Sequence, residues 1–179
     1  MPLKKLSSDA KVIGKYESWL KIKSGILIVT GEAGSGKTTT VYSLLNEFKN
    51  QGRVVFTIEE SAELIIDGVH QVEMKGLPQY HFENIYSQVR ASDPDVICIL
   101  VNSVIGIEEL IYKTAQTAAM SGKLILLQLN FKNCAEALES FCKFAGDASK
   151  SLIQGISAQS LVSENGFLKA QYNFISTNS

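Results

Sequence analysis

The segment GEAGSGKTTT, at positions 31–40, constrains the fold of this 179-residue chain more than any other part of the sequence. It fits the pattern G-x-x-x-x-G-K-[ST] through Gly31, Gly36, Lys37 and Thr38. Such a segment needs a β-strand before it and an α-helix after it. The apolar run 25–30 predicts the strand, and residues 38–49 predict the helix because their apolar side chains recur at the spacing of one helical face.

Each part of this loop suits the binding of phosphate groups. Its glycines allow the backbone to curl so that successive N–H groups converge on an anion. The helix that follows directs its positive dipole end at the same point. Lys37 would reach the outer phosphates, and the Thr38 hydroxyl would ligate Mg²⁺. The predicted contact set is Gly31, Glu32, Ala33, Gly34, Ser35, Gly36, Lys37, Thr38 and Thr39.

Beyond the loop, short β-rich runs alternate with helical segments, which predicts a three-layer α/β fold with a mainly parallel sheet. Further strands are expected at 53–58, 95–101 and 123–129, and helices at 82–89, 107–120, 135–144 and 149–159. Residues 160–162 and 167–175 predict a C-terminal β-hairpin around a turn at 164–166. Residues 1–20 are expected to form a lead-in helix or tail, and residues 1–179 a single domain.

Composition narrows the function classes. A net charge of −1 and a pI of about 6.1 lack the basic footprint of a nucleic-acid-binding protein. The longest apolar runs, such as 96–101, are far shorter than the roughly 20 residues of a membrane-spanning helix. Three cysteines without metal-ligand spacing fit a reducing cytosol. We therefore expect a cytoplasmic protein with no membrane span and no nucleic-acid partner.

Four landmarks, in this order, resemble the motor ATPases of type II secretion and of type IV pilus extension and retraction. The run GEAGSGKTTTVYSLL is similar to that family's Gly-Pro-Thr-Gly-Ser-Gly-Lys-[Ser/Thr]-Thr-Thr-Leu-Tyr. Residues 57–61, Thr-Ile-Glu-Glu-Ser, resemble its acidic box Thr-Ile-Glu-Asp-Pro. Residues 93–97 match its Asp-Pro-Asp-Val-Ile, and residues 121–125, Ser-Gly-Lys-Leu-Ile, resemble its Thr-Gly-His-Leu-Val.

This resemblance implies a RecA-like P-loop NTPase fold, with ATP or ADP and Mg²⁺ as ligands and a hexameric homo-oligomer as the assembly. It also implies partners among pilus or secretion assembly proteins, or a full-length motor ATPase, at the cytoplasmic side of the inner membrane. Family members usually carry a domain ahead of the phosphate loop. This chain begins close to the phosphate loop, so we expect either weaker contacts to the adenine or a partner that supplies them.

The sequence departs from the family where hydrolysis should occur. The Gly-Glu pair that closes the family's Walker B strand falls on Leu100 and Val101, so the catalytic glutamate position holds a hydrocarbon. The histidine of the family's Thr-Leu-His-Thr box falls on Asn130. The family's arginine before Asp-Pro-Asp falls on Ala91, with Arg90 one position away. The resemblance thus predicts a nucleotide binder with impaired hydrolysis and a regulatory or structural role.

Three alternatives stay open. In the first, the chain is a working ATPase in which Glu59 or Glu60, at the end of the second expected strand, takes over the catalytic role with help from Arg90 or a neighbouring subunit. In the second it is a small phosphotransferase, although only two arginines, Arg53 and Arg90, are available for a lid. In the third it is an interaction module whose phosphate loop is a relic.

Overall fold

A computed structural model of the chain describes residues 2–74, 81–101, 106–164 and 167–176. A seven-stranded sheet forms its centre, in the order β3-β2-β4-β5-β1-β6-β7. The strands are β1 (Gly25–Gly31), β2 (Val55–Glu59), β3 (His70–Glu73), β4 (Val96–Leu100), β5 (Leu124–Leu129), β6 (Ile153–Glu164) and β7 (Phe167–Ile175). Strands β1 to β6 pair in parallel, and β7 is antiparallel to β6.

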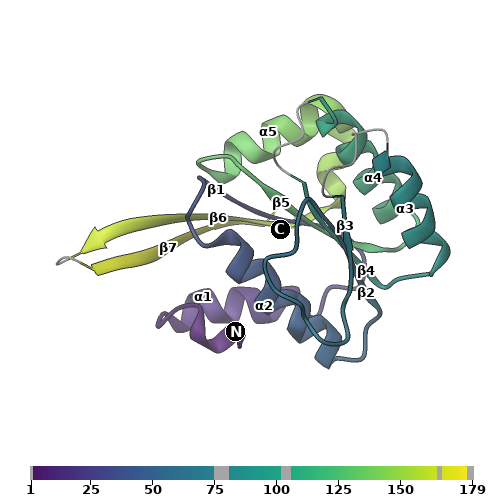
Figure 1. The fold of residues 1–179 in the computed structure, drawn as a ribbon. Helices are drawn as coiled ribbons and strands as arrows, with labels where there is room; N and C mark the ends of the chain where they lie inside the picture. The colour runs from purple at the N-terminus through teal and green to yellow at the C-terminus, as the bar shows by residue number, and fades with distance from the viewer. Residues whose placement is uncertain (1, 75–80, 102–105, 165–166, 177–179) are drawn as a thin grey trace.

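Helices cover both faces of this sheet (Figure 1). The α-helices are α1 (Ala10–Trp19), α2 (Lys37–Asn50), α3 (His81–Ala91), α4 (Glu108–Met120) and α5 (Cys134–Ala145). Two short 3₁₀ helices accompany them, η1 (Leu3–Lys5) and η2 (Asp147–Leu152). Helices α1 and α2 lie on one face and α3, α4 and α5 on the other. The predicted three-layer α/β fold with a mainly parallel sheet is therefore confirmed.

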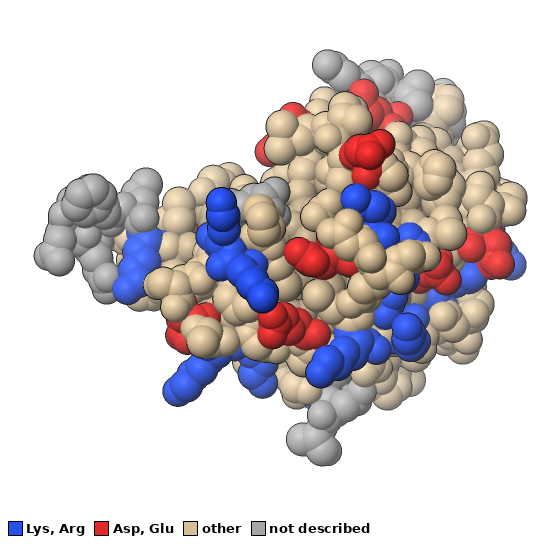
Figure 2. Space-filling model, turned by 90° about the horizontal axis from the view of Figure 1, so that it is seen from below, with Lys and Arg blue, Asp and Glu red and all other residues tan. Residues whose placement is uncertain are grey.

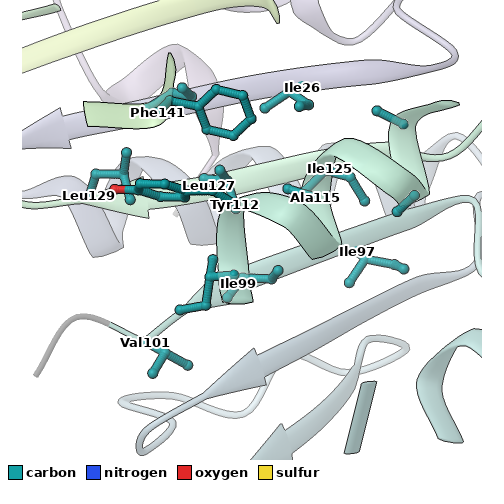
Figure 3. Close-up of a cluster of buried hydrophobic side chains, with 14 of the residues drawn as sticks. Ile26, Ile97, Ile99, Val101, Tyr112, Ala115, Ile125, Leu127, Leu129 and Phe141 are labelled. Atoms are coloured by element: carbon teal, nitrogen blue, oxygen red, sulfur yellow. The ribbon is translucent and has the colours of Figure 1, made fainter. Parts of the chain in front are cut away.

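Because strand side chains alternate between the two faces of the sheet, the buried strands contribute side chains to two separate hydrophobic cores. Along β5, Leu124 and Leu126 join the core beneath α1 and α2, whereas Ile125 and Leu127 join the core beneath α3 to α5. Figure 3 shows the second core. Its labelled members are Ile26, Ile97, Ile99, Val101, Tyr112, Ala115, Ile125, Leu127, Leu129 and Phe141.

The prediction of a helix over residues 149–159 is wrong. Only the segment up to Leu152 is helical, as part of η2, and Ile153 begins the long strand β6, which pairs with β1. Gly155 allows β6 to pack closely against α1, because a Cβ atom there would lie 2.6 Å from Nε1 of Trp19. The pairing with β1 is remote in sequence, and it overrides the weak local preference of this stretch for a helix.

The predicted C-terminal hairpin is confirmed, and it is longer than expected. Strands β6 and β7 pair from Ile156 with Ile175 to Glu164 with Phe167, and their far end projects from the body of the molecule (Figure 1). The turn residues 165 and 166 lie outside the described part of the chain. Residues 75–80 also lie outside it.

Helix α1 lies within the segment 1–20, expected as a lead-in helix or tail, and packs against the base of this hairpin. Tyr16 is buried and contacts three aromatic rings edge-on, at centroid distances of 5.2 Å to Trp19, 6.0 Å to Tyr172 and 5.1 Å to Phe174. Its hydroxyl lies 2.6 Å from Ser157 Oγ of β6. On the surface of this side of the molecule, Lys and Arg mix with Asp and Glu (Figure 2).

Candidate nucleotide-binding site

The glycine-rich loop connects β1 to α2 at the carboxyl edge of the sheet, as its sequence predicts. Gly34 and Gly36 adopt φ angles of 78° and 87°, a region that residues with a Cβ atom rarely enter. Helix α2 begins at Lys37, and no side chain caps its first turn. Its leading N–H groups are therefore available to an anion, and the helix dipole favours negative charge at the same place.

Strand β6, which pairs with β1, contacts the loop and fixes its position. A Cβ atom at Gly31 would lie 2.2 Å from the backbone oxygen of Gln159, so only glycine permits this approach. The Gln159 amide Nε2 donates to the backbone oxygen of Ser35 at 2.8 Å, and its Oε1 accepts from the Thr40 hydroxyl at 2.9 Å. One glutamine thus joins the phosphate loop and the first turn of α2 to the central sheet.

Lys37 is folded against its own loop. Its side chain is 5% exposed, and Nζ donates to the backbone oxygen of Glu32 at 2.7 Å. Burial lowers the pKa of this ammonium group below its ordinary value. A phosphate placed on the loop would offer the ammonium a charged partner in place of a neutral carbonyl, an exchange that favours the protonated form.

Thr38 opens onto a cavity of about 330 Å³, which we call the α2-side cavity. It is lined by Thr38, Tyr42, Glu59, Glu60, Ser61, Ala62, Glu63, Leu100 and Gln128. Strand register explains this lining: Glu59 pairs with Leu100, and Gln128 follows Leu127, which pairs with Ile99. A carboxylate, a hydrocarbon and an amide therefore lie side by side along the sheet edge that faces Thr38.

Among these groups, the Glu59 carboxylate is fixed by three hydrogen bonds. It is 2% exposed, and its two carboxylate oxygens accept from the hydroxyls of Tyr42 at 2.5 Å and Thr57 at 2.6 Å and from the amide of Gln71 at 3.0 Å. Burial, followed by the bond to Glu59, raises the pKa of Tyr42 well above its ordinary value, so its hydroxyl stays a donor. Glu60 lines the same cavity, and its N–H donates to the Leu100 carbonyl at 3.3 Å.

A second cavity, of about 170 Å³, lies on the other face of the same edge, and we call it the α4-side cavity. Its lining consists of Ile99, Val101, Glu108, Ile111, Tyr112, Leu127, Gln128, Leu129, Asn130 and Phe131. The positions aligned with the family's glutamate and histidine, Val101 and Asn130, therefore share one cavity. The carboxylate of Glu108 accepts from the Gly106 N–H at 2.9 Å, within the turn that precedes α4.

Arg90 lies apart from both cavities. It is exposed in the last turn of α3 and belongs to the described lining of neither cavity. Asp95 lies at the amino end of β4, where its Oδ2 accepts from the Val54 N–H at 2.7 Å, a contact that joins the start of β4 to the residue before β2. Nearby, the hydrogen bond from Lys123 lowers the pKa of the exposed Asp93.

Three site residues escaped the sequence analysis: Tyr42, Gln128 and Gln159. Gln128 did carry a signal, because it is the one polar residue in the buried run Leu-Ile-Leu-Leu-Gln-Leu of β5 and lies next to its carboxyl end. Tyr42 had no comparable signal, since it falls on the buried face of an ordinary amphipathic helix. Gln159 was hidden by the incorrect helix prediction for 149–159.

The residues present suit a magnesium nucleotide. Uncapped N–H groups and Lys37 suit the phosphates, while the Thr38 hydroxyl and the carboxylates of the α2-side cavity suit a hard divalent cation. Two buried side-chain oxygens, Ser35 Oγ and Gln128 Oε1, have no hydrogen-bond partner among the described residues. Among the same residues, no three His, Cys, Asp or Glu side chains gather into a metal site of their own.

The parallel sheet and the loop between β1 and α2 define a P-loop NTPase fold. The family described as "Type II/IV secretion system protein" matches residues 1–174, and this chain belongs to that family. None of the described helices is both long and apolar enough to cross a membrane.

The similarity extends to individual relatives and to solved structures. The chain is 29% identical over 160 residues to the type II secretion system protein E of Xanthomonas campestris pv. campestris, covering 88% of this chain and 28% of that protein. It is 31% identical to competence protein ComGA of Bacillus subtilis over 161 residues, covering 88% and 44% respectively. It therefore spans less than half the length of these relatives. The crystal structure of the pilus retraction motor PilT with bound ADP matches with a TM-score of 0.80 and 25% identity, over 100% of this chain and 54% of that one.

Proposed function

We propose that this chain binds ATP or ADP with Mg²⁺ through residues 31–39, with Thr38 as the magnesium ligand, and that its hydrolysis of ATP is impaired. Its role would be regulatory or structural in a type II secretion or type IV pilus machine. One observation carries the proposal: the loop and Thr38 are complete, whereas β4 presents Leu100 to the cavity in front of Thr38.

Support for binding comes from the loop itself. Gly34 and Gly36 hold the curled backbone, Gln159 fixes it to β6, and Lys37 supplies a cation at the start of α2. Magnesium would neutralise charge on the phosphates when bound. In this chain, Thr38 would hold the ion, and Glu59 and Glu60 would face it across the α2-side cavity.

Support for impaired hydrolysis comes from β4 and β5. Neither Leu100 nor Val101 can accept a proton, and Asn130 cannot replace the imidazole expected by resemblance. A well-placed general base accelerates a reaction by roughly 10²–10⁴-fold. Loss of the base, the histidine and one arginine together would therefore reduce a typical turnover of roughly 1–10³ per second to a rate too slow to drive a motor.

A working ATPase that uses Glu59 or Glu60 is the second candidate, favoured by the presence of both residues in the α2-side cavity. For Glu59 this role conflicts with its hydrogen bonds, because Tyr42, Thr57 and Gln71 already donate to its two oxygens. A base must be free to contact the attacking water. Glu60 lies one residue beyond the strand and lines the same cavity, so it is the second carboxylate of this alternative.

The test combines calorimetric titration of ATP in Mg²⁺ with steady-state phosphate release. The variants are Lys37→Ala and, as a matched control, Lys15→Ala, which changes an exposed lysine of α1. We expect the native chain to bind ATP and release phosphate well below one per second. Lys37→Ala should weaken binding at least about tenfold, because it removes a charged hydrogen bond, and Lys15→Ala should match the native chain.

Other results would favour other functions. Turnover of about one per second or faster that Lys37→Ala abolishes would support the working ATPase. No detectable ATP binding in Mg²⁺ would contradict the proposal and favour an interaction module with a relic loop.

The family membership also supports proposals about assembly and place. We propose that residues 1–179 act as one nucleotide-binding unit in the cytoplasm and reach the inner membrane through pilus or secretion assembly proteins or a full-length motor ATPase. A homo-oligomer, hexameric by resemblance, is part of this proposal. Light scattering with and without Mg²⁺ and ADP would test it, and a monomer under both conditions would contradict it.

A further inference from the structure

Gln128 is an unusual residue for its position in the fold. It lies in β5, which is buried along its entire length, and its other five residues are Leu or Ile. Gln128 is 8% exposed, and its Oε1 is buried without a hydrogen-bond partner among the described residues. Buried polar atoms are nearly always hydrogen-bonded in folded proteins. An orphaned acceptor of this kind therefore calls for a partner that the chain itself does not supply.

The position of Gln128 indicates what this partner is. The alternation along β5 places its side chain on the α2 face, and it lines the α2-side cavity together with Thr38 and Glu59. The described lining of that cavity includes three carboxylates, Glu59, Glu60 and Glu63, and neither Lys nor Arg. A cavity with this lining favours a cation, and Mg²⁺ keeps several of its water molecules when it binds a protein. Such waters are hydrogen-bond donors, as an amide oxygen requires.

We propose that Gln128 is a further binding residue of the magnesium nucleotide, and that its Oε1 accepts a hydrogen bond from a water molecule of the ion that Thr38 holds. This inference rests on the proposed function, because it presupposes that a magnesium nucleotide occupies the loop. In the resemblance to the motor ATPases, position 128 aligns with the first threonine of Thr-Leu-His-Thr. The longer glutamine side chain is thus a feature of this chain.

The register makes such a contact reasonable in this fold. Gln128 pairs with Val29, two residues before the loop begins at Gly31. The end of β5 is also joined directly to the end of β1, because the Thr30 hydroxyl donates to the Phe131 carbonyl at 3.0 Å and accepts from its N–H at 2.9 Å. The two strands that carry Gln128 and the phosphate loop are therefore held together at the edge where the ion would lie.

The experiment measures ADP affinity by calorimetry in two arms, one with MgCl₂ and one with EDTA. Gln128→Leu removes the acceptor at similar volume, and Gln128→Glu keeps an acceptor at the same position. Gln88→Leu, at an exposed site on α3, controls for the chemical change. We expect Mg²⁺ to tighten ADP binding by the native chain, and Gln128→Leu to reduce that gain by about three- to tenfold, as for one lost hydrogen bond.

The other variants show whether Gln128 contributes to magnesium binding or only to the stability of the fold. Gln128→Glu should retain the native gain from Mg²⁺ or exceed it, and Gln88→Leu should match the native chain in both arms. If Gln128→Leu keeps the full gain, or weakens ADP binding equally in both arms, the inference is overturned and Gln128 is structural. If the native chain binds no ADP in either arm, the proposed function itself fails, which is a distinct outcome.

Discussion

The two cavities at the carboxyl edge of the sheet are built from the same strands and yet differ in chemistry. The lining of the α2-side cavity includes three glutamates and Thr38, whereas the α4-side cavity is lined mainly by apolar residues. The difference arises from strand alternation, since Leu100 and Gln128 face α2 while Leu127 and Val101 belong to the opposite core. A substitution at one position of a strand can therefore alter one cavity, while its neighbour in the sequence alters the other.

This separation explains how binding groups and catalytic groups can diverge within one site. The phosphate loop is fixed by α2 and β6, through Gln159, without any contribution from Val101 or Asn130. Those two positions instead line a cavity in which Tyr112 packs against Phe141 at 5.2 Å. Apolar residues there extend the hydrophobic core, and each buried aliphatic side chain contributes roughly 1.5–3 kcal/mol.

The largest effect is expected on the loop side, from Gly31→Ala. The new methyl group would meet the backbone of Gln159 and the hydroxyl of Ser35, at 2.2 and 2.6 Å. Because backbone cannot yield easily, the free energy of unfolding should fall by about 3 kcal/mol, and ADP binding should be lost. Urea denaturation measures the first effect and calorimetry the second.

Gly34→Ala is the matched control for that substitution. Gly34 also has a positive φ angle, but no atom lies within 4 Å of the added methyl group. Gly34→Ala should therefore lower the free energy of unfolding only by the strain of a residue with a Cβ atom in the left-handed conformation, about 1–2 kcal/mol. An equal decrease in the free energy of unfolding for the two variants would show that close packing on β6 does not fix the loop.

A rate effect is expected on the α4 side, from the double variant Val101→Glu/Asn130→His. Both positions line one cavity, so the new carboxylate and imidazole can be partners and offset the cost of burying a charge. We expect phosphate release to rise at least about tenfold over the native rate, toward the lower limit for a general base. Steady-state phosphate release measures it, with ATP affinity checked in parallel.

The single variants are the controls. Asn130→His alone should remain close to the native rate, and Val101→Glu alone should raise the rate less than the double variant does, because its buried carboxylate lacks the imidazole partner. No increase in the double variant, despite unchanged ATP affinity, would mean that these two positions do not account for the impaired hydrolysis. The difference between the cavities would then be one of packing alone.

How far the sequence could predict this fold depends on how local each signal is. The strand, loop and helix from Gly25 to Asn50 follow one another directly, and their pattern identified them within one or two residues. Strand β6 was not predicted from its local sequence, because its place in the sheet comes from pairing with β1, more than 120 residues earlier. Polar residues such as Ser157 and Gln159 hid its apolar pattern, since their partners are known only once the strands are assembled.

The site shows the same limit. Motif spacing was enough to predict the phosphate-binding loop, but it could not show that Leu100 and Val101 face different cavities. The partnership of Tyr42 with Glu59 joins a helix to a strand across the sheet edge, and no sequence interval encodes it. Whether Glu59, Glu60 or Arg90 takes part in catalysis stays a prediction.

A matched pair of tyrosines compares the hydrogen bonding of the two cavities. Tyr42 donates to Glu59 at 2.5 Å and accepts from the Glu63 N–H at 3.1 Å, whereas the Tyr112 hydroxyl lies 3.4 Å from Ser140. Tyr42→Phe leaves a buried carboxylate short of a donor, so it should lower the free energy of unfolding by about 1–2 kcal/mol. Tyr112→Phe should cost less than half as much.

Urea denaturation provides this comparison, and amide hydrogen exchange adds a local readout. In Tyr42→Phe, the Glu63 amide should exchange faster than in the native chain, because its acceptor is gone. If both variants lost equal stability, the network around Glu59 would be no stronger than the long contact in the other cavity.

The smallest expected effect concerns the charge buried beside the phosphate loop. Burial lowers the pKa of Lys37 in the folded protein below its ordinary value of 10.5. Below the folded pKa the ammonium is charged in both states, and folding carries the full cost of burying it. As the pH rises through the folded pKa toward 10.5, the folded protein loses the proton first, and that cost disappears.

Lys37→Met removes this cost, so the nucleotide-free variant should be more stable than the native chain by about 0.5–1 kcal/mol at neutral pH. The advantage should shrink as the pH approaches 10.5, whereas Lys15→Met, on the exposed face of α1, should show no such trend. Urea denaturation at several pH values measures both differences. A Lys37→Met advantage that stays constant with pH would mean that packing, and not the buried charge, distinguishes this side of the sheet.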